Sequence, residues 1–148
     1  MTESTETPKE TKGIEDAYKN EEEVSKVLDE RTIDKSLLDK LPTPTGYRIL
    51  ILPWSGPKKT KGGIILSDKT HETIQMTTVC GLVLKMGSLC YRDKERFPFG
   101  KWCNERDWVI FGRYAGSRFK IEGGEVRILN DDEIIATISN PADILHHY

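Results

Sequence analysis

The chain has 148 residues, of which 36% are hydrophobic and 31% charged, and its formal net charge is -2. This length suits one domain with an appendage rather than two full domains. The slightly negative charge argues against a general nucleic-acid or membrane binder, which needs a field of positive charge. The first residues lack the basic and then apolar order of a signal peptide, and no window is apolar enough to span a membrane, so we expect a cytoplasmic protein.

The N-terminal quarter of the chain differs from the rest in charge. Residues 1–36 hold eleven acidic and six basic side chains, whereas residues 37–148 hold thirteen acidic and sixteen basic ones. Residues 1–12 offer little to bury, and residues 13–41 carry only a thin apolar stripe at helical spacing. Pro42 and Pro44 then interrupt any helix. We therefore predict a charged, partly helical or disordered N-terminal extension over residues 1–41 and a folded domain over residues 42–148.

The remainder of the chain has the pattern of an all-β protein. Short runs rich in Ile, Val, Leu and aromatic residues are separated by Gly, Pro, Asn and Asp. Gly123 and Gly124 lie between two such runs and allow the positive φ of a tight hairpin. The pattern indicates a small, partly open β-barrel. The predicted strands are residues 47–52, 77–86, 107–111, 117–121, 126–129 and 133–139.

A long polar stretch, residues 55–75, does not fit a barrel strand. Connections of this length are usually functional or disordered. The stretch contains two glycines followed by three aliphatic residues: Gly62, Gly63, Ile64, Ile65 and Leu66. The triplet could be a strand that joins the core, or a docking segment whose glycines let the chain bend and whose aliphatic side chains fill a groove on another protein.

A second stretch, residues 88–105, is predicted to be a projecting hairpin. Its aromatic residues are Tyr91, Phe97, Phe99 and Trp102, and its basic residues are Arg92, Lys94, Arg96 and Lys101. We favour a structural interpretation, in which the aromatic rings stiffen the hairpin beneath solvated cations. The alternative function is a single-stranded nucleic-acid platform, in which rings stack on bases and cations follow the phosphates.

No catalytic group or metal site emerges from the sequence. The residues able to carry such chemistry are His71, His146, His147, Cys80, Cys90 and Cys103. The cysteines lack metal-ligand spacing, and no nucleophile stands with a base, so we predict a protein that is not an enzyme. The odd number of cysteines indicates reduced thiols, and we expect the histidines to be solvated.

Five segments, in order, resemble the GroES co-chaperonin family. They are residues 46–51, the motif at residues 62–66, residues 81–87, residues 106–111, and residues 125–129 followed by 133–138. Gly62-Gly63-Ile64-Ile65-Leu66 is similar to the family's mobile-loop signature, and residues 88–105 would form its roof hairpin. The resemblance covers about residues 43–141, and five matches in order are far more specific than one.

The resemblance implies a seven-membered ring in which the first and last strands of neighbouring barrels pair. Each subunit would present residues 62–66 to a GroEL-type chaperonin, and the ring would cap the chamber that encloses unfolded clients. ATP would be bound by the chaperonin, and this chain would need no cofactor. Tyr114 lies near the position of an aromatic residue that faces the ring interior in the family.

The extension over residues 1–41 has no counterpart in ordinary members of the family. Virus-encoded relatives elaborate this scaffold, so the resemblance is compatible with a bacteriophage protein that acts in the cytoplasm of its host.

Overall fold

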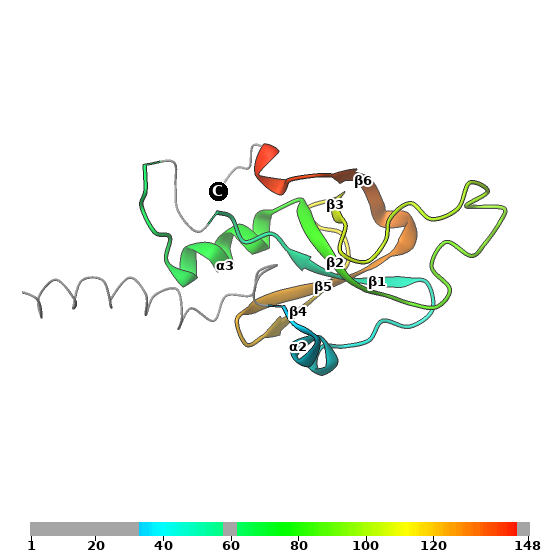
Figure 1. The fold of residues 1–148 in the computed structure, drawn as a ribbon, viewed down its shortest axis with the longest axis horizontal. Coiled ribbons are helices and arrows are strands. Elements are labelled where there is room, and N and C mark those ends of the chain that lie inside the picture. Colours follow the sequence, from blue (N-terminus) through cyan, green and yellow to red (C-terminus); the bar gives the residue numbers. More distant parts are fainter. Residues whose placement is uncertain (1–32, 58–61, 145–148) are drawn as a thin grey trace, which may run out of the picture.

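The computed structural model describes residues 33–57 and 62–144. Six strands form one antiparallel sheet in the order β4-β5-β1-β2-β3-β6. This confirms the predicted all-β fold, a small and partly open barrel (Figure 1). The strands are β1 (Arg48–Pro53), β2 (Cys80–Met86), β3 (Trp108–Phe111), β4 (Ser117–Ile121), β5 (Gly124–Asn130) and β6 (Ile134–Ile138).

The predicted tight hairpin joins β4 to β5. Ile121 pairs with Gly124, and Gly123 in the turn has a φ of 97°. Gly124 also has no room for a side chain, because a Cβ there would lie 2.4 Å from Oε1 of Gln75. The two glycines therefore serve different needs, one a left-handed turn and the other a close approach.

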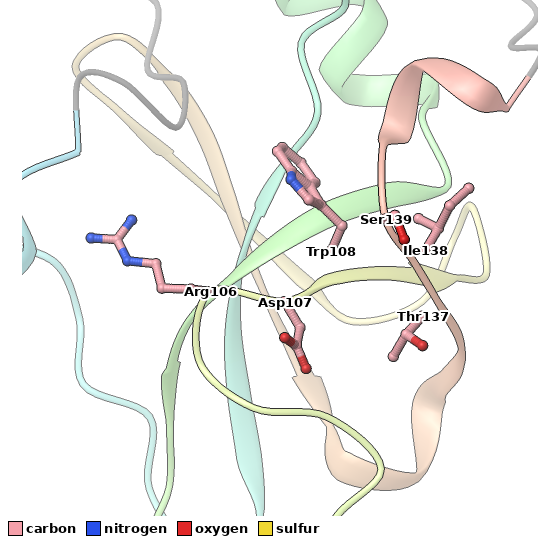
Figure 2. A pocket seen from close by; sticks show the side chains of 6 residues that line it. All are labelled: Arg106, Asp107, Trp108, Thr137, Ile138 and Ser139. Carbon is pink, nitrogen blue, oxygen red and sulfur yellow. The ribbon is translucent and has the colours of Figure 1, made fainter.

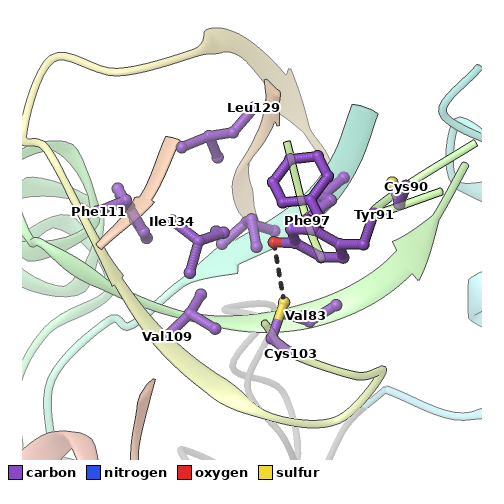
Figure 3. Close-up of a cluster of buried hydrophobic side chains, with 11 residues drawn as sticks. Val83, Cys90, Tyr91, Phe97, Cys103, Val109, Phe111, Leu129 and Ile134 are labelled. Atoms are coloured by element: carbon purple, nitrogen blue, oxygen red, sulfur yellow. Dashed lines mark hydrogen bonds between the residues drawn. The ribbon is translucent and has the colours of Figure 1, made fainter. Parts of the chain in front are cut away.

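One face of the sheet forms the main hydrophobic core (Figure 3). Side chains at alternate positions of the strands meet there, among them Ile49, Val83 and Phe111. The segment between β2 and β3 closes this face, since Tyr91 and Phe97 are both buried against the strand residues. The core thus includes side chains from outside the sheet.

The opposite face of the sheet is also apolar and is covered by the N-terminal segment. Helix α2 (Lys35–Lys40) begins at Asp34, whose side chain accepts a hydrogen bond from the Leu37 amide. Ile33 and Leu41 flank the helix and are buried in a second cluster with strand residues such as Leu50. Residues 33–41 therefore pack on the sheet, although they belong to the predicted extension.

The domain boundary predicted at residue 42 remains a prediction. Of residues 13–41, in which a thin apolar stripe is expected, residues 13–32 lie outside the described residues.

Helix α3 (Asp68–Thr77) corrects the expectation of a continuous polar loop up to residue 75. Ser67 caps it by accepting a hydrogen bond from the Thr70 amide. The helix buries His71, Ile74 and Gln75, a face that is mostly polar and that hydrophobic periodicity does not detect. Within residues 33–57 and 62–144, no helix is long and apolar enough to cross a membrane.

Leu41 provides a test of whether the N-terminal segment belongs to the fold. We expect Leu41→Ala to lower the free energy of unfolding by about 2 kcal/mol or more, because the side chain is 7% exposed and its loss leaves a cavity. Asp39→Ala, on the exposed side of the same helix, should change it by less than about 0.5 kcal/mol. Urea unfolding of the full chain at one protein concentration measures both. Equal stability of the two variants would contradict the packing of this segment.

Candidate functional site

The segment predicted to dock on a partner, residues 62–66 and here called the docking segment, carries one exposed and two half-buried aliphatic side chains. Gly63 has a φ of 87°, and a Cβ there would have open space around it, so the turn and not crowding requires glycine. Ile64 is 67% exposed, and Ile65 and Leu66 are half-buried. In Figure 1, the chain just before α3 and the segment between β2 and β3 lie at opposite ends of the described part of the molecule. The structure thus displays the predicted triplet outside the main core cluster.

The two sides of the loop are joined at its base by a side chain. His71 is buried, and its Nδ1 lies 2.6 Å from the carbonyl oxygen of Ser55. Since the carbonyl can only accept, Nδ1 carries the hydrogen and donates it. The expectation that His71 is solvated is wrong, because α3 turns this side chain toward the base of the loop. His146 and His147 lie outside the described residues.

A buried arginine on β5 holds the C-terminal end of α3. Arg127 is fully buried, and its guanidinium donates to the carbonyl oxygens of Gln75 and Met76 at 3.1 Å each and of Arg113 at 2.8 Å. Its Nε lies 3.6 Å from Oε1 of Glu125. Burial, and then the cation of Arg118, lower the pKa of Arg127, while Glu125 opposes them. The arginine caps the last turn of the helix, where backbone carbonyls have no partner within the helix, and Arg118 donates to the Met76 carbonyl as well.

The second candidate stretch, residues 88–105, projects as predicted but contains no strand. Its backbone is a series of turns, with a φ of 60° at Tyr91, and the word hairpin does not fit it. Tyr91 ties the stretch to the barrel twice: its amide donates to Oδ2 of Asp131, and its hydroxyl donates to the carbonyl of Asp131 at 2.8 Å. Phe97 packs edge-on against Tyr91, with ring centroids 4.9 Å apart.

Two of the four aromatic rings of this stretch are buried in the core, and the other two are exposed at the surface. Phe99 is fully exposed and Trp102 is 47% exposed, whereas Tyr91 and Phe97 are buried and cannot stack on bases. Arg92 is exposed, and Arg96 is already paired with a carboxylate outside the stretch. The structural interpretation is therefore favoured over a nucleic-acid platform. Acidic side chains also interleave with the basic ones: Asp93, Glu95 and Glu105.

Comparison with known proteins bears on both stretches. The family model of the chaperonin 10 kDa subunit (Cpn10) matches residues 42–138. The chain belongs to the chaperonin 10 family. Its relatives include the co-chaperonin GroES of Thermotoga neapolitana, which is 35% identical over 95 residues, covering 64% of this chain and 92% of the relative. The co-chaperonin GroES of Coprothermobacter proteolyticus is 33% identical over 98 residues, covering 66% of this chain and 94% of the relative.

Membership of the chaperonin 10 family confirms the resemblance on which the sequence analysis relied, and it supports a co-chaperonin function. The docking segment and residues 88–105, here called the turn-rich stretch, both lie within the matched residues, while residues 1–41 lie outside them. The family agrees with the expectation that this chain is not an enzyme. Tyr114, the predicted ring-interior aromatic, is 85% exposed in the turn between β3 and β4.

The three cysteines are free and buried. Cys103 lies 3.6 Å from the hydroxyl of Tyr91 beneath the turn-rich stretch (Figure 3). Burial raises the pKa of Cys80 and of Cys90 to about 11. Among the described residues, no group of three or more His, Cys, Asp or Glu side chains could hold a metal ion.

The raised thiol pKa values predict a loss of stability in alkali. In the unfolded chain a thiol ionises near its ordinary value of 9.0, whereas Cys80 stays protonated in the folded state up to about pH 11. The free energy of unfolding should therefore fall as the pH rises from about 9 to about 11. Urea unfolding at several pH values measures this fall, and Cys80→Ala should reduce its slope. An unchanged slope in that variant would count against the thiol as its cause.

Proposed function

We propose that this protein is a co-chaperonin that assembles into a seven-membered ring and caps a GroEL-type chaperonin through the docking segment. The observation that carries the proposal is the aliphatic triplet, with Ile64 exposed and Ile65 and Leu66 half-buried, which follows a glycine turn inside the residues that match the chaperonin 10 family. The enclosed clients would be unfolded proteins in the cytoplasm. ATP would be bound and hydrolysed by the chaperonin.

The chemistry of the docking segment suits an apolar groove. Burial of three large aliphatic side chains contributes roughly 5 to 9 kcal/mol at best. Fixing the backbone of each newly ordered residue costs about 1 to 2 kcal/mol. One loop therefore binds weakly and can be released. Several loops on one ring raise the effective concentration of each further contact, so the ring binds much more tightly than one loop.

The strand available for ring closure is β6. Among the described strands, β4 and β6 form the two edges of the sheet, and an unpaired edge can add a strand from another chain. The expectation that the first barrel strand pairs with a neighbour is wrong for β1, because β1 is already paired with β2 and β5. The neighbour would therefore have to contribute a segment other than β1.

The surface beside β6 is hollowed. A cavity of about 560 Å³ lies along β3 and β6, and Figure 2 shows Trp108 and Ile138 directed to one side of these strands and Asp107 and Thr137 to the other. Trp108 and Ile138 are paired across the two strands. Ile135 on β6 is 69% exposed, an apolar side chain on an open edge. These features support β6 as the place where two subunits meet.

Co-sedimentation with a GroEL-type chaperonin tests the proposal as a whole. The full chain should pellet with the chaperonin in the presence of ATP or ADP and remain in the supernatant without nucleotide. Two results would overturn the proposal. One is co-sedimentation that is the same with and without nucleotide, and the other is tight, salt-sensitive binding to an oligonucleotide without any chaperonin complex.

Substitution of Ile65 tests the docking segment. Ile65→Asp should abolish co-sedimentation, because a carboxylate cannot enter an apolar groove without losing its hydration. The ring should stay intact, since residues 62–66 lie outside the strands. Lys69→Gln changes the net charge by the same amount on an exposed site nearby and should leave binding unchanged. Retained capping by Ile65→Asp would show that the docking segment lies elsewhere.

Substitution of Ile135 tests the edge strand. Ile135→Lys places a charge on the open edge and should shift the ring toward monomers, whereas Ile135→Val should preserve it. Analytical ultracentrifugation reports the oligomeric state, and circular dichroism checks that the barrel remains folded. A ring that tolerates the lysine would place the subunit contact away from this part of β6.

A further inference from the structure

The docking segment passes directly into a folded helix. Residue 66 ends the segment, Ser67 is the N-cap of α3, and the helix runs from Asp68 to Thr77. Besides accepting from the Thr70 amide, the Ser67 hydroxyl lies 2.9 Å from the hydroxyl of Thr70. The C-terminal side of the loop is therefore regular structure before any partner is present.

The N-terminal half of α3 is tied to the other side of the loop. His71 donates from Nδ1 to the carbonyl of Ser55, a bond 2.6 Å long between residues on either side of the docking segment. Ile74, one turn further along α3, packs on Gly56. A Cβ added to Gly56 would lie only 2.6 Å from Cδ1 of Ile74. Gly56 also has a φ of 88°, so a side chain there would be both strained and crowded. The two sides of the loop base are thus fastened together.

The C-terminal half of α3 is tied to the barrel. The side chain of Gln75 is buried, and its Nε2 donates to the carbonyl of Pro53 while its Oε1 accepts from the amide of Glu125. These bonds are 3.1 and 3.2 Å long and reach β1 and β5. Arg127 adds its two bonds to the last carbonyls of the helix. The helix is held at both ends by buried polar groups with defined partners.

We infer that α3 is a preformed stem that positions the docking segment for its apolar groove, with His71 and Gln75 as the positioning residues. The inference rests on the proposed function. A stem that is already folded need not be ordered when the loop docks, and each residue spared from ordering raises the affinity of a single loop by about tenfold. The stem would thus restrict the ordering on binding to the residues before Ser67.

Hydrogen exchange of the full chain without any partner tests whether the stem exists. Amides in the second half of α3 should exchange at least about tenfold more slowly than those of residues 62–66. His71→Ala should remove most of this protection, and His71→Asn should restore it, because the asparagine amide can donate from nearly the position of Nδ1. Equal exchange rates in the wild-type helix and docking segment would overturn the inference.

Binding of two matched variants tests whether the stem positions the segment. The side chain of Thr73 is exposed on α3, so Thr73→Pro breaks the helix without placing a new side chain in the core, and Thr73→Ala keeps the helix. The proline variant should lose at least about tenfold in chaperonin affinity while circular dichroism shows that the barrel is still folded, and the alanine variant should bind normally. Equal affinities would overturn the positioning role. If the wild type itself fails to bind, the proposed function fails, and hydrogen exchange alone judges the stem.

Discussion

The contacts of the buried Arg127 guanidinium are the interactions on which the end of the molecule that carries residues 62–66 depends. A fully buried cation must have hydrogen-bond partners, and this one finds carbonyl oxygens at the end of α3 and in the turn that contains Tyr114. It thereby joins a strand, a helix and a turn that are distant in sequence. Arg118 also donates to the Met76 and Arg113 carbonyls and lies near Glu125, so removing the Arg127 guanidinium would deprive mainly the Gln75 carbonyl of its donor from β5. Arg127 thus links the end of α3 to β5.

The other end of the molecule is organised by a different buried polar link. Tyr91 reaches Asp131 through its amide and its hydroxyl, which holds the turn-rich stretch over the main core without any strand. This arrangement allows Phe97 to be buried while Phe99 stays exposed at the surface. The barrel therefore carries two irregular segments, each held at its base by buried hydrogen bonds. Both depend on side chains that contribute polar contacts rather than apolar area.

The sequence predicted the features that depend on apolar periodicity and glycine. All six strands begin and end within about three residues of the expected positions. The turn at Gly123 and the aliphatic triplet that lies outside the main core cluster were recognisable because glycine and aliphatic residues mark them. Helix α3 was missed because its buried face is made by His71 and Gln75, whose burial requires partners far away in sequence. The packing of Leu41 was missed for a related reason, since a second apolar face of the sheet becomes visible only when the strands are assembled.

The proposed stem and the proposed ring would both raise the affinity of this protein for a chaperonin. Three aliphatic side chains contribute a free energy that the ordering of only a handful of residues would offset, so an arm without a folded stem would bind hardly at all. A stem reduces that ordering, and a ring multiplies the small remainder through effective concentration. A docking segment with a much higher affinity would stay bound to the chaperonin when the nucleotide cycle of the chaperonin requires release. A short arm on a fixed stem, repeated around a ring, combines a tight cap with contacts that can each be released.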